Sequence, residues 1–197
     1  MTDAARDRSR GGLDNAHLAL LVFLVAEVML FAALVSSYLI FQSGEPSWPP
    51  PGLPRLPLAV TAANTLGLLL SAVTMLKSLS ALRAGRQGAF RGLLATTAVL
   101  GLLFLSVQGL EWTRLVSAPI PLNLRSGMFG AVFYALVGLH ALHVLGAVLW
   151  LLEVLRRALA GRYGPSSAAP SLCTVYWLFV VILWMGLFAL VYLPWKS

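Results

Sequence analysis

The chain has 197 residues, of which 59% are hydrophobic and only 11% are charged, whereas a soluble domain is about half apolar and about a quarter charged. This composition excludes a soluble globular protein and indicates an integral membrane protein. Predominantly apolar runs cover about 18–41, 57–80, 92–113, 127–152 and 172–194. Each run can cross a hydrocarbon layer about 30 Å thick as a helix, so we predict an all-α, polytopic bundle of five transmembrane helices.

The distribution of charge predicts the orientation of this bundle. Ten of the 14 basic residues lie in segments 6–10, 77–91 and 156–162, all on one side of the predicted membrane. The positive-inside rule therefore places the N-terminus in the cytoplasm and the C-terminus in the periplasm. Residues 1–16 form a cytoplasmic tail, and 17–197 form one transmembrane domain. Because the basic residues follow the loops, we expect anionic lipid headgroups as counter-charge and no nucleic acid.

The first run contains a carboxyl group near mid-membrane. Glu27 lies roughly 14 Å along the helix from the cytoplasmic edge, where an ionised side chain is costly. We therefore expect it to be protonated or paired. The run at 127–152 crosses in the opposite direction and places His140 and His143 at a similar depth, so these groups could meet. In the alternative interpretation, Glu27 bonds only a helix backbone or a hydroxyl and serves packing.

The second run carries small polar residues, and a proline-rich link precedes it. This link, with Trp48, is predicted to form an extended external loop at the headgroups. We expect Asn64, Thr65, Ser71 and Thr74 to hydrogen-bond neighbouring helices.

The third run ends in a polar group at the predicted outer boundary. Gln108 and Glu111 are three residues apart and share a helix face. We expect Glu111 to be partly solvated and paired with Arg114 or Arg125. Trp112 has the position of an anchor at the membrane surface.

The fourth run, 127–152, organises the chain because it carries both mid-membrane histidines. Imidazoles at this depth are costly unless they face protein, so the helix must pack among others with His140 and His143 turned inward. Gly127, Ala131 and Ala135 form a small-xxx-small ridge that predicts close approach of another helix.

The fifth run has no charged residue and is rich in aromatic side chains. We assign Trp177 and Trp184 as further interface anchors, together with Trp48 and Trp112.

Counting ligands argues against a metal or haem centre within this chain. His140 and His143 cannot reach both faces of one haem from a single helix, and His17 lies near the cytoplasmic edge. A closed copper or zinc site would need a third strong ligand, which only Glu27 could supply. The sequence therefore predicts no catalytic residue, no metal site and no electron transfer by the chain alone.

The order of several motifs resembles subunit III of the haem–copper oxidases. The motifs are VAEVMLF (25–31), WPPPG (48–52), ANTLGLLLSAVTM (63–75), SVQGLEW (106–112), SGMFGAVFYALVGLHALHVLGAV (126–148) and YWLFVVILW (176–184). They occur in the family's order and cover nearly every span. With five spans, the chain is similar to the short bacterial form, cytochrome c oxidase subunit 3.

This resemblance implies an accessory, non-redox subunit in the bacterial inner membrane. Such a subunit packs on the catalytic subunit I, beside subunit II and possible small subunits or a supercomplex, while haem and copper stay in the partners. It stabilises the enzyme during turnover, supports proton uptake, holds phospholipid and guides oxygen inward. Glu27 matches the family's buried glutamate, which reacts with hydrophobic carbodiimides, and His140 and His143 match its HxxH pair.

One departure and two alternatives remain at this point. Leu178 and Val181 replace the His and Asp that the family's last helix usually carries, so the polar contacts of those residues are lost here. Related subunits serve quinol oxidases and nitric oxide reductases, and the electron donor and the gas are handled by other chains. A small membrane transporter built on Glu27, the histidines and Asn64 is the alternative from another class, although the chain shows no internal repeat.

Overall fold

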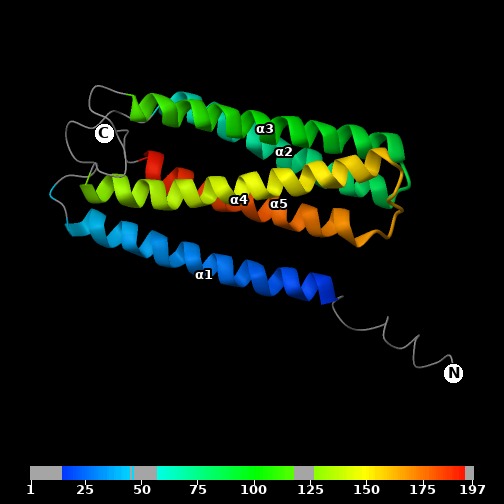
Figure 1. The fold of residues 1–197 in the computed structure, drawn as a ribbon, viewed down its shortest axis with the longest axis horizontal. Helices are drawn as coiled ribbons and strands as arrows, with labels where there is room; N and C mark the ends of the chain where they lie inside the picture. Colours follow the sequence, from blue (N-terminus) through cyan, green and yellow to red (C-terminus); the bar gives the residue numbers. More distant parts are fainter. Residues whose placement is uncertain (1–14, 45, 47–56, 118–126, 194–197) are drawn as a thin grey trace.

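Five long helices make up nearly all of the chain that the structure describes, as the sequence predicts (Figure 1). The computed structural model describes residues 15–44, 46, 57–117 and 127–193. The helices are α1 (Asn15–Gly44), α2 (Leu58–Arg83), α3 (Gln87–Val116), α4 (Gly127–Leu159) and α5 (Ala168–Tyr192). Each is long and apolar enough to cross a membrane, so the chain is a multi-pass membrane protein. Trp48 and Arg125 lie outside the described residues.

In the helical hairpins α2–α3 and α4–α5, the first helix ends at a glycine with a left-handed backbone. Gly85 (φ 71°) follows α2 and Gly161 (φ 70°) follows α4. At each turn, the glycine N–H and the next N–H bond back to carbonyls of the last helical turn, which is the Schellman arrangement. Other residues are strained at this φ, so these glycines determine where α2 and α4 end.

Helix α4 lies at the centre of the bundle and α1 at its periphery. α4 contacts α1, α3 and α5, while α2 and α3 pack against each other as a hairpin. In Figure 1, α1 runs along one side of the bundle, next to α4 and away from the α2–α3 hairpin. Only Phe31 and Tyr38 of α1 are buried, so most of the apolar surface of this helix is exposed.

The small-residue ridge of α4 does not pack as the sequence predicts. Gly127 and Ala135 are exposed and Ala131 is half-buried. The helix instead buries its large apolar side chains, including Phe133 and Leu136. The prediction of a close intrachain contact at this ridge is therefore wrong for the described helices, because α4 presents its bulky faces to its neighbours.

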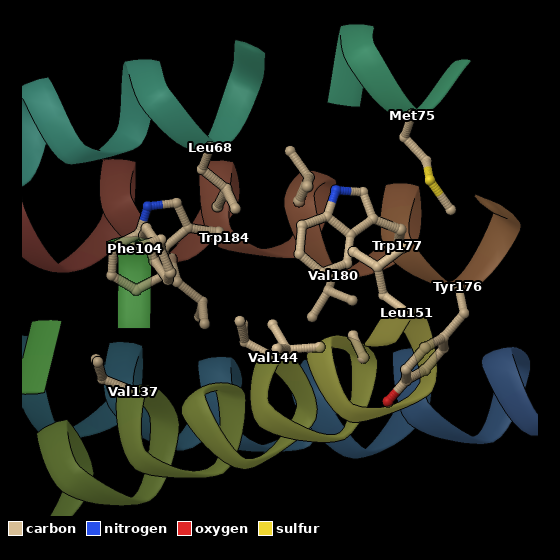
Figure 2. Close-up of a cluster of buried hydrophobic side chains, with 14 of the residues drawn as sticks. Leu68, Met75, Phe104, Val137, Val144, Leu151, Tyr176, Trp177, Val180 and Trp184 are labelled. Carbon is tan, nitrogen blue, oxygen red and sulfur yellow. The ribbon is translucent and has the colours of Figure 1, made fainter. Parts of the chain in front are cut away.

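Trp177 and Trp184 lie in the core and not at an interface with the headgroups. Figure 2 shows both indoles projecting from α5 among buried side chains of the neighbouring helices. They are 1% and 0% exposed. Each indole N–H donates to a hydroxyl of α2: Trp177 to Ser71 Oγ (3.1 Å) and Trp184 to Thr65 Oγ1 (2.9 Å). Their assignment as interface anchors is corrected, because the small polar residues of α2 satisfy the indoles inside the bundle.

The end of α4 that is predicted to face the cytoplasm carries a charged group beyond the 127–152 run. Glu153 accepts hydrogen bonds from Arg156 (2.7 Å) and Arg157 (2.6 Å). These bonds lower the pKa of Glu153 to about 2, and the bond from Arg156 has the largest effect. The carboxylate is therefore ionised at neutral pH and offsets part of the positive charge at this end.

Candidate functional site

The structure brings Glu27 of α1 and His143 of α4 together. His143 Nε2 lies 2.8 Å from Glu27 Oε2. The His143 side chain is 12% exposed and the Glu27 side chain is 14% exposed. The expectation that Glu27 has a partner and lies level with the histidines is confirmed for His143. The alternative, in which Glu27 bonds only a backbone group or a hydroxyl, does not describe this geometry.

A backbone carbonyl determines the proton arrangement of the pair. His143 Nδ1 lies 2.8 Å from the Leu139 carbonyl oxygen, which can only accept, so Nδ1 carries a hydrogen. If Glu27 were ionised and Nε2 unprotonated, two acceptors would face each other. The pair must therefore hold at least one proton between these two atoms. With one such proton, it is either carboxylic acid with neutral imidazole or carboxylate with imidazolium. In both forms its net charge is zero, which lowers the cost of burial in a membrane.

Aromatic side chains lie near the pair. The Phe31 ring packs edge-on against the His143 ring, with centroids 5.3 Å apart. One turn before Glu27 on α1, Phe23 contacts Tyr176 of α5, with centroids 6.1 Å apart. Figure 2 shows the Tyr176 hydroxyl directed toward α4 and α1. The contacts of α1 with α4 and α5 next to the pair are thus largely aromatic.

His140 does not join His143 in a common site. Its ring stacks on Trp184, with centroids 5.1 Å apart and planes at 23°, and the residue is 1% exposed. Neither ring nitrogen has a hydrogen-bond partner among the described residues. The two histidines therefore face different neighbours, and no group of three candidate metal ligands occurs within the part of the chain that the structure describes.

Asn64 and the hydroxyls of α2 connect helices, as the sequence predicts. Asn64 Nδ2 donates to the Phe104 carbonyl of α3 at 3.1 Å. The Thr74 and Thr97 hydroxyls, on α2 and α3, are 2.8 Å apart. These contacts support a structural role for Asn64 and leave it apart from the Glu27–His143 pair.

Gln108 and Glu111 lie on the buried side of α3. Gln108 Nε2 donates to the Tyr192 hydroxyl of α5 at 3.2 Å. Glu111 Oε1 lies 3.6 Å from Arg114 Nη1, which confirms the expected pairing with Arg114. The expectation of a partly solvated Glu111 is wrong, because the side chain is 3% exposed while that of Arg114 is 76% exposed. Only the outer partner of this pair reaches the surface.

Trp112 is half-buried beside these groups. Its ring packs edge-on against Tyr134 of α4, with centroids 5.9 Å apart. Its indole N–H is buried without a partner among the described residues.

Sequence reasoning missed Tyr176, Tyr192 and the Leu139 carbonyl. The two tyrosines occur in an aromatic-rich run whose members look alike, and no charge distinguishes them. The Leu139 carbonyl could have been found, because residue i−4 of a helix lies directly below a side chain at residue i.

Comparison with known proteins supports the family resemblance that the order of the motifs indicates. The family model for cytochrome c oxidase subunit III matches residues 10–197. Cytochrome c oxidase subunit 3 of Synechocystis sp. is 35% identical over 185 residues, covering 93% of this chain and 77% of the relative. The subunit 3 of Thermostichus vulcanus is 32% identical over 190 residues, covering 92% of each chain. A probable subunit 3 of Nocardia farcinica is 32% identical over 175 residues, with 87% and 84% covered. The chain therefore belongs to the cytochrome c oxidase subunit III family.

Proposed function

We propose that this chain is the accessory, non-redox subunit of a haem–copper terminal oxidase that uses cytochrome c, in a bacterial inner membrane. The observation that carries the proposal is the family match over residues 10–197. Haem and copper reside in partner chains, with catalytic subunit I as the main contact and subunit II in the same complex. The subunit stabilises that complex during turnover, and phospholipid binds along its exposed apolar helices.

The Glu27–His143 pair is the part of this subunit that supports proton uptake. It holds one shared proton at zero net charge, and transfer of that proton between Glu27 and His143 changes the dipole of the pair but not its net charge. A dipole that changes in this way can respond to the field of a neighbouring proton path. The neutral form also has the protonated carboxyl that adds to a carbodiimide, with its proton going to the reagent's nitrogen, which agrees with the reactivity that the family resemblance implies.

Co-purification and deletion test the accessory role. Extraction in a mild detergent should bring down a larger subunit with haem and copper absorption. Deleting this chain should leave the haem spectra intact, while oxygen consumption decays faster during continuous turnover. Loss of the haems themselves after deletion would show that the chain has a primary role in the redox centre.

The alternatives give different results in the same preparation. A quinol oxidase subunit would co-purify with haem but support oxygen reduction from quinol, and a nitric oxide reductase subunit would co-purify with nitric oxide reduction. A small transporter would be isolated without haem absorption, as an oligomer of this chain alone. Asn64 bonds a backbone carbonyl of α3 and His140 faces Trp184, so these residues do not converge with Glu27 on one mid-membrane transport site.

A further inference from the structure

Unpartnered buried polar atoms gather in one region of the bundle. Among the described residues, six buried side-chain nitrogen or oxygen atoms have no hydrogen-bond partner. Five of the six belong to α3 and α4: Gln108 Oε1, Glu111 Oε2, Trp112 Nε1 and both ring nitrogens of His140. The sixth, Arg91 Nε, belongs to the opposite end of α3. Native proteins leave few such atoms unsatisfied, so this concentration requires a physical explanation.

These atoms adjoin a single junction of α3, α4 and α5. Gln108, Glu111 and Trp112 follow the i, i+3, i+4 spacing of one helix face. Gln108 bonds the Tyr192 hydroxyl, and the Tyr192 ring is 6.1 Å from Trp184 by centroids. Trp184 in turn stacks on His140. Gln108 and His140 thus flank the same pair of α5 aromatic rings, while Trp112 packs on Tyr134 of α4.

The kinds of atom present identify the class of ligand. Gln108 Oε1 accepts hydrogen bonds and does not donate them, and the same holds for Glu111 Oε2 when Glu111 is ionised. Trp112 Nε1, by contrast, only donates. The neutral His140 ring offers one donor and one acceptor. A metal cation would satisfy only the acceptors, and an anion only the donors. Water donates and accepts, and buried water typically makes about three bonds to otherwise unsatisfied groups.

We propose that a cluster of ordered water molecules occupies this junction and hydrogen-bonds Gln108, Glu111, Trp112 and His140. Water enters from the Arg114 side, where an exposed guanidinium lies 3.6 Å from the buried Glu111 carboxylate. The cluster extends a polar path from the end of α3 inward to His140. It is separate from the Glu27–His143 pair and rests on the proposed function only in that the tests below use the assembled complex.

Infrared spectroscopy of the assembled complex tests the cluster. Spectra in ordinary and ¹⁸O-labelled water identify O–H stretching bands of internal water by their isotope shift. Subtracting the spectrum of the Gln108→Leu variant from that of the wild type should leave such bands. The same should hold for His140→Phe. Thr97→Val is the matched control, because Thr97 is buried but already bonds Leu93 O and Thr74. Bands that are unchanged in both test variants would overturn the proposal.

A second measurement needs no variant and decides the matter if the substituted chains fail to assemble. A density map of the wild-type complex, at a resolution that shows ordered water, should contain peaks about 2.6–3.2 Å from Gln108 Oε1 and from Glu111 Oε2. A map in which protein or lipid atoms fill these positions, or in which they have no density, refutes the water cluster.

Discussion

Glu27 and His143 are 116 residues apart in sequence, yet their side chains meet at 2.8 Å and join the peripheral helix α1 to the central helix α4. Other α1 contacts are mostly apolar, and such contacts give little directional preference between helices in lipid. The polar pair therefore determines the rotation of α1 about its own axis and its position along α4. This relationship makes the pair a determinant of structure as well as the leading candidate for function.

Glu27→Gln should abolish labelling by a hydrophobic carbodiimide. The reagent reacts with a protonated carboxyl in apolar surroundings, and the Glu27–His143 arrangement provides one in its neutral form. Mass spectrometry of the labelled chain measures the result. Glu153→Gln is the control and should leave labelling unchanged, because Arg156 and Arg157 lower the pKa of Glu153 to about 2 and keep it ionised. Label that stays on the Glu27→Gln chain would show that another carboxyl is the reactive one.

The contact between Glu27 and His143 should also appear as a coupling energy. Each single change, Glu27→Leu or His143→Leu, leaves the other polar group unpaired and should destabilise the bundle by about 1–3 kcal/mol. The double variant should lose less than the sum of the two, because neither unpaired group remains. Unfolding in mixed detergent micelles measures these free energies. Strict additivity would mean that the two side chains do not interact in solution.

Gly101→Ala should destabilise the protein, because Gly101 leaves room for the Trp177 ring, which reaches α3 from α5. A Cβ at this position would lie 2.5 Å from Cη2 of Trp177 and 3.3 Å from Cγ2 of Val148. Overpacking of this kind costs about 1–3 kcal/mol. Gly109→Ala, on the same helix, is the matched control, since its added Cβ meets nothing within 4 Å. The control should be neutral or slightly stabilising through helix propensity, and equal losses in the two variants would contradict the packing argument.

The sequence predicts the number and extent of the helices well, because apolar run length is a strong signal in a membrane protein. It also predicts that Glu27 and the histidines lie at a similar depth and could meet, since counting residues from opposite ends of two helices gives their depth. It does not predict which histidine, because rotation about the helix axis depends on packing. The burial of Trp184 and Glu111 was missed for the same reason: depth can be read from sequence, but distance from the bundle axis cannot.

Thr65→Val should destabilise the core through its effect on Trp184. The Thr65 hydroxyl accepts the buried indole N–H at 2.9 Å, and its removal leaves that donor without a partner. The expected cost is about 1–3 kcal/mol, measured by unfolding in mixed micelles. Thr96→Val is the control, because the exposed Thr96 hydroxyl bonds only the Gly92 carbonyl of its own helix. An equal effect in both variants would show that the indole bond contributes nothing specific.

The orientation of the bundle can be tested with single cysteines in a Cys173→Ser background. Ser117 follows α3 and Ser166 lies between α4 and α5, and both are exposed. The positive-inside rule assigns Ser117 to the periplasm and Ser166 to the cytoplasm. A membrane-impermeant maleimide added to intact cells with a permeable outer layer should label Ser117→Cys and spare Ser166→Cys. Opening the cells should expose Ser166→Cys to the reagent, which controls for its reactivity. The reverse pattern would mean that the ten basic residues of segments 6–10, 77–91 and 156–162 face outward, against the charge argument.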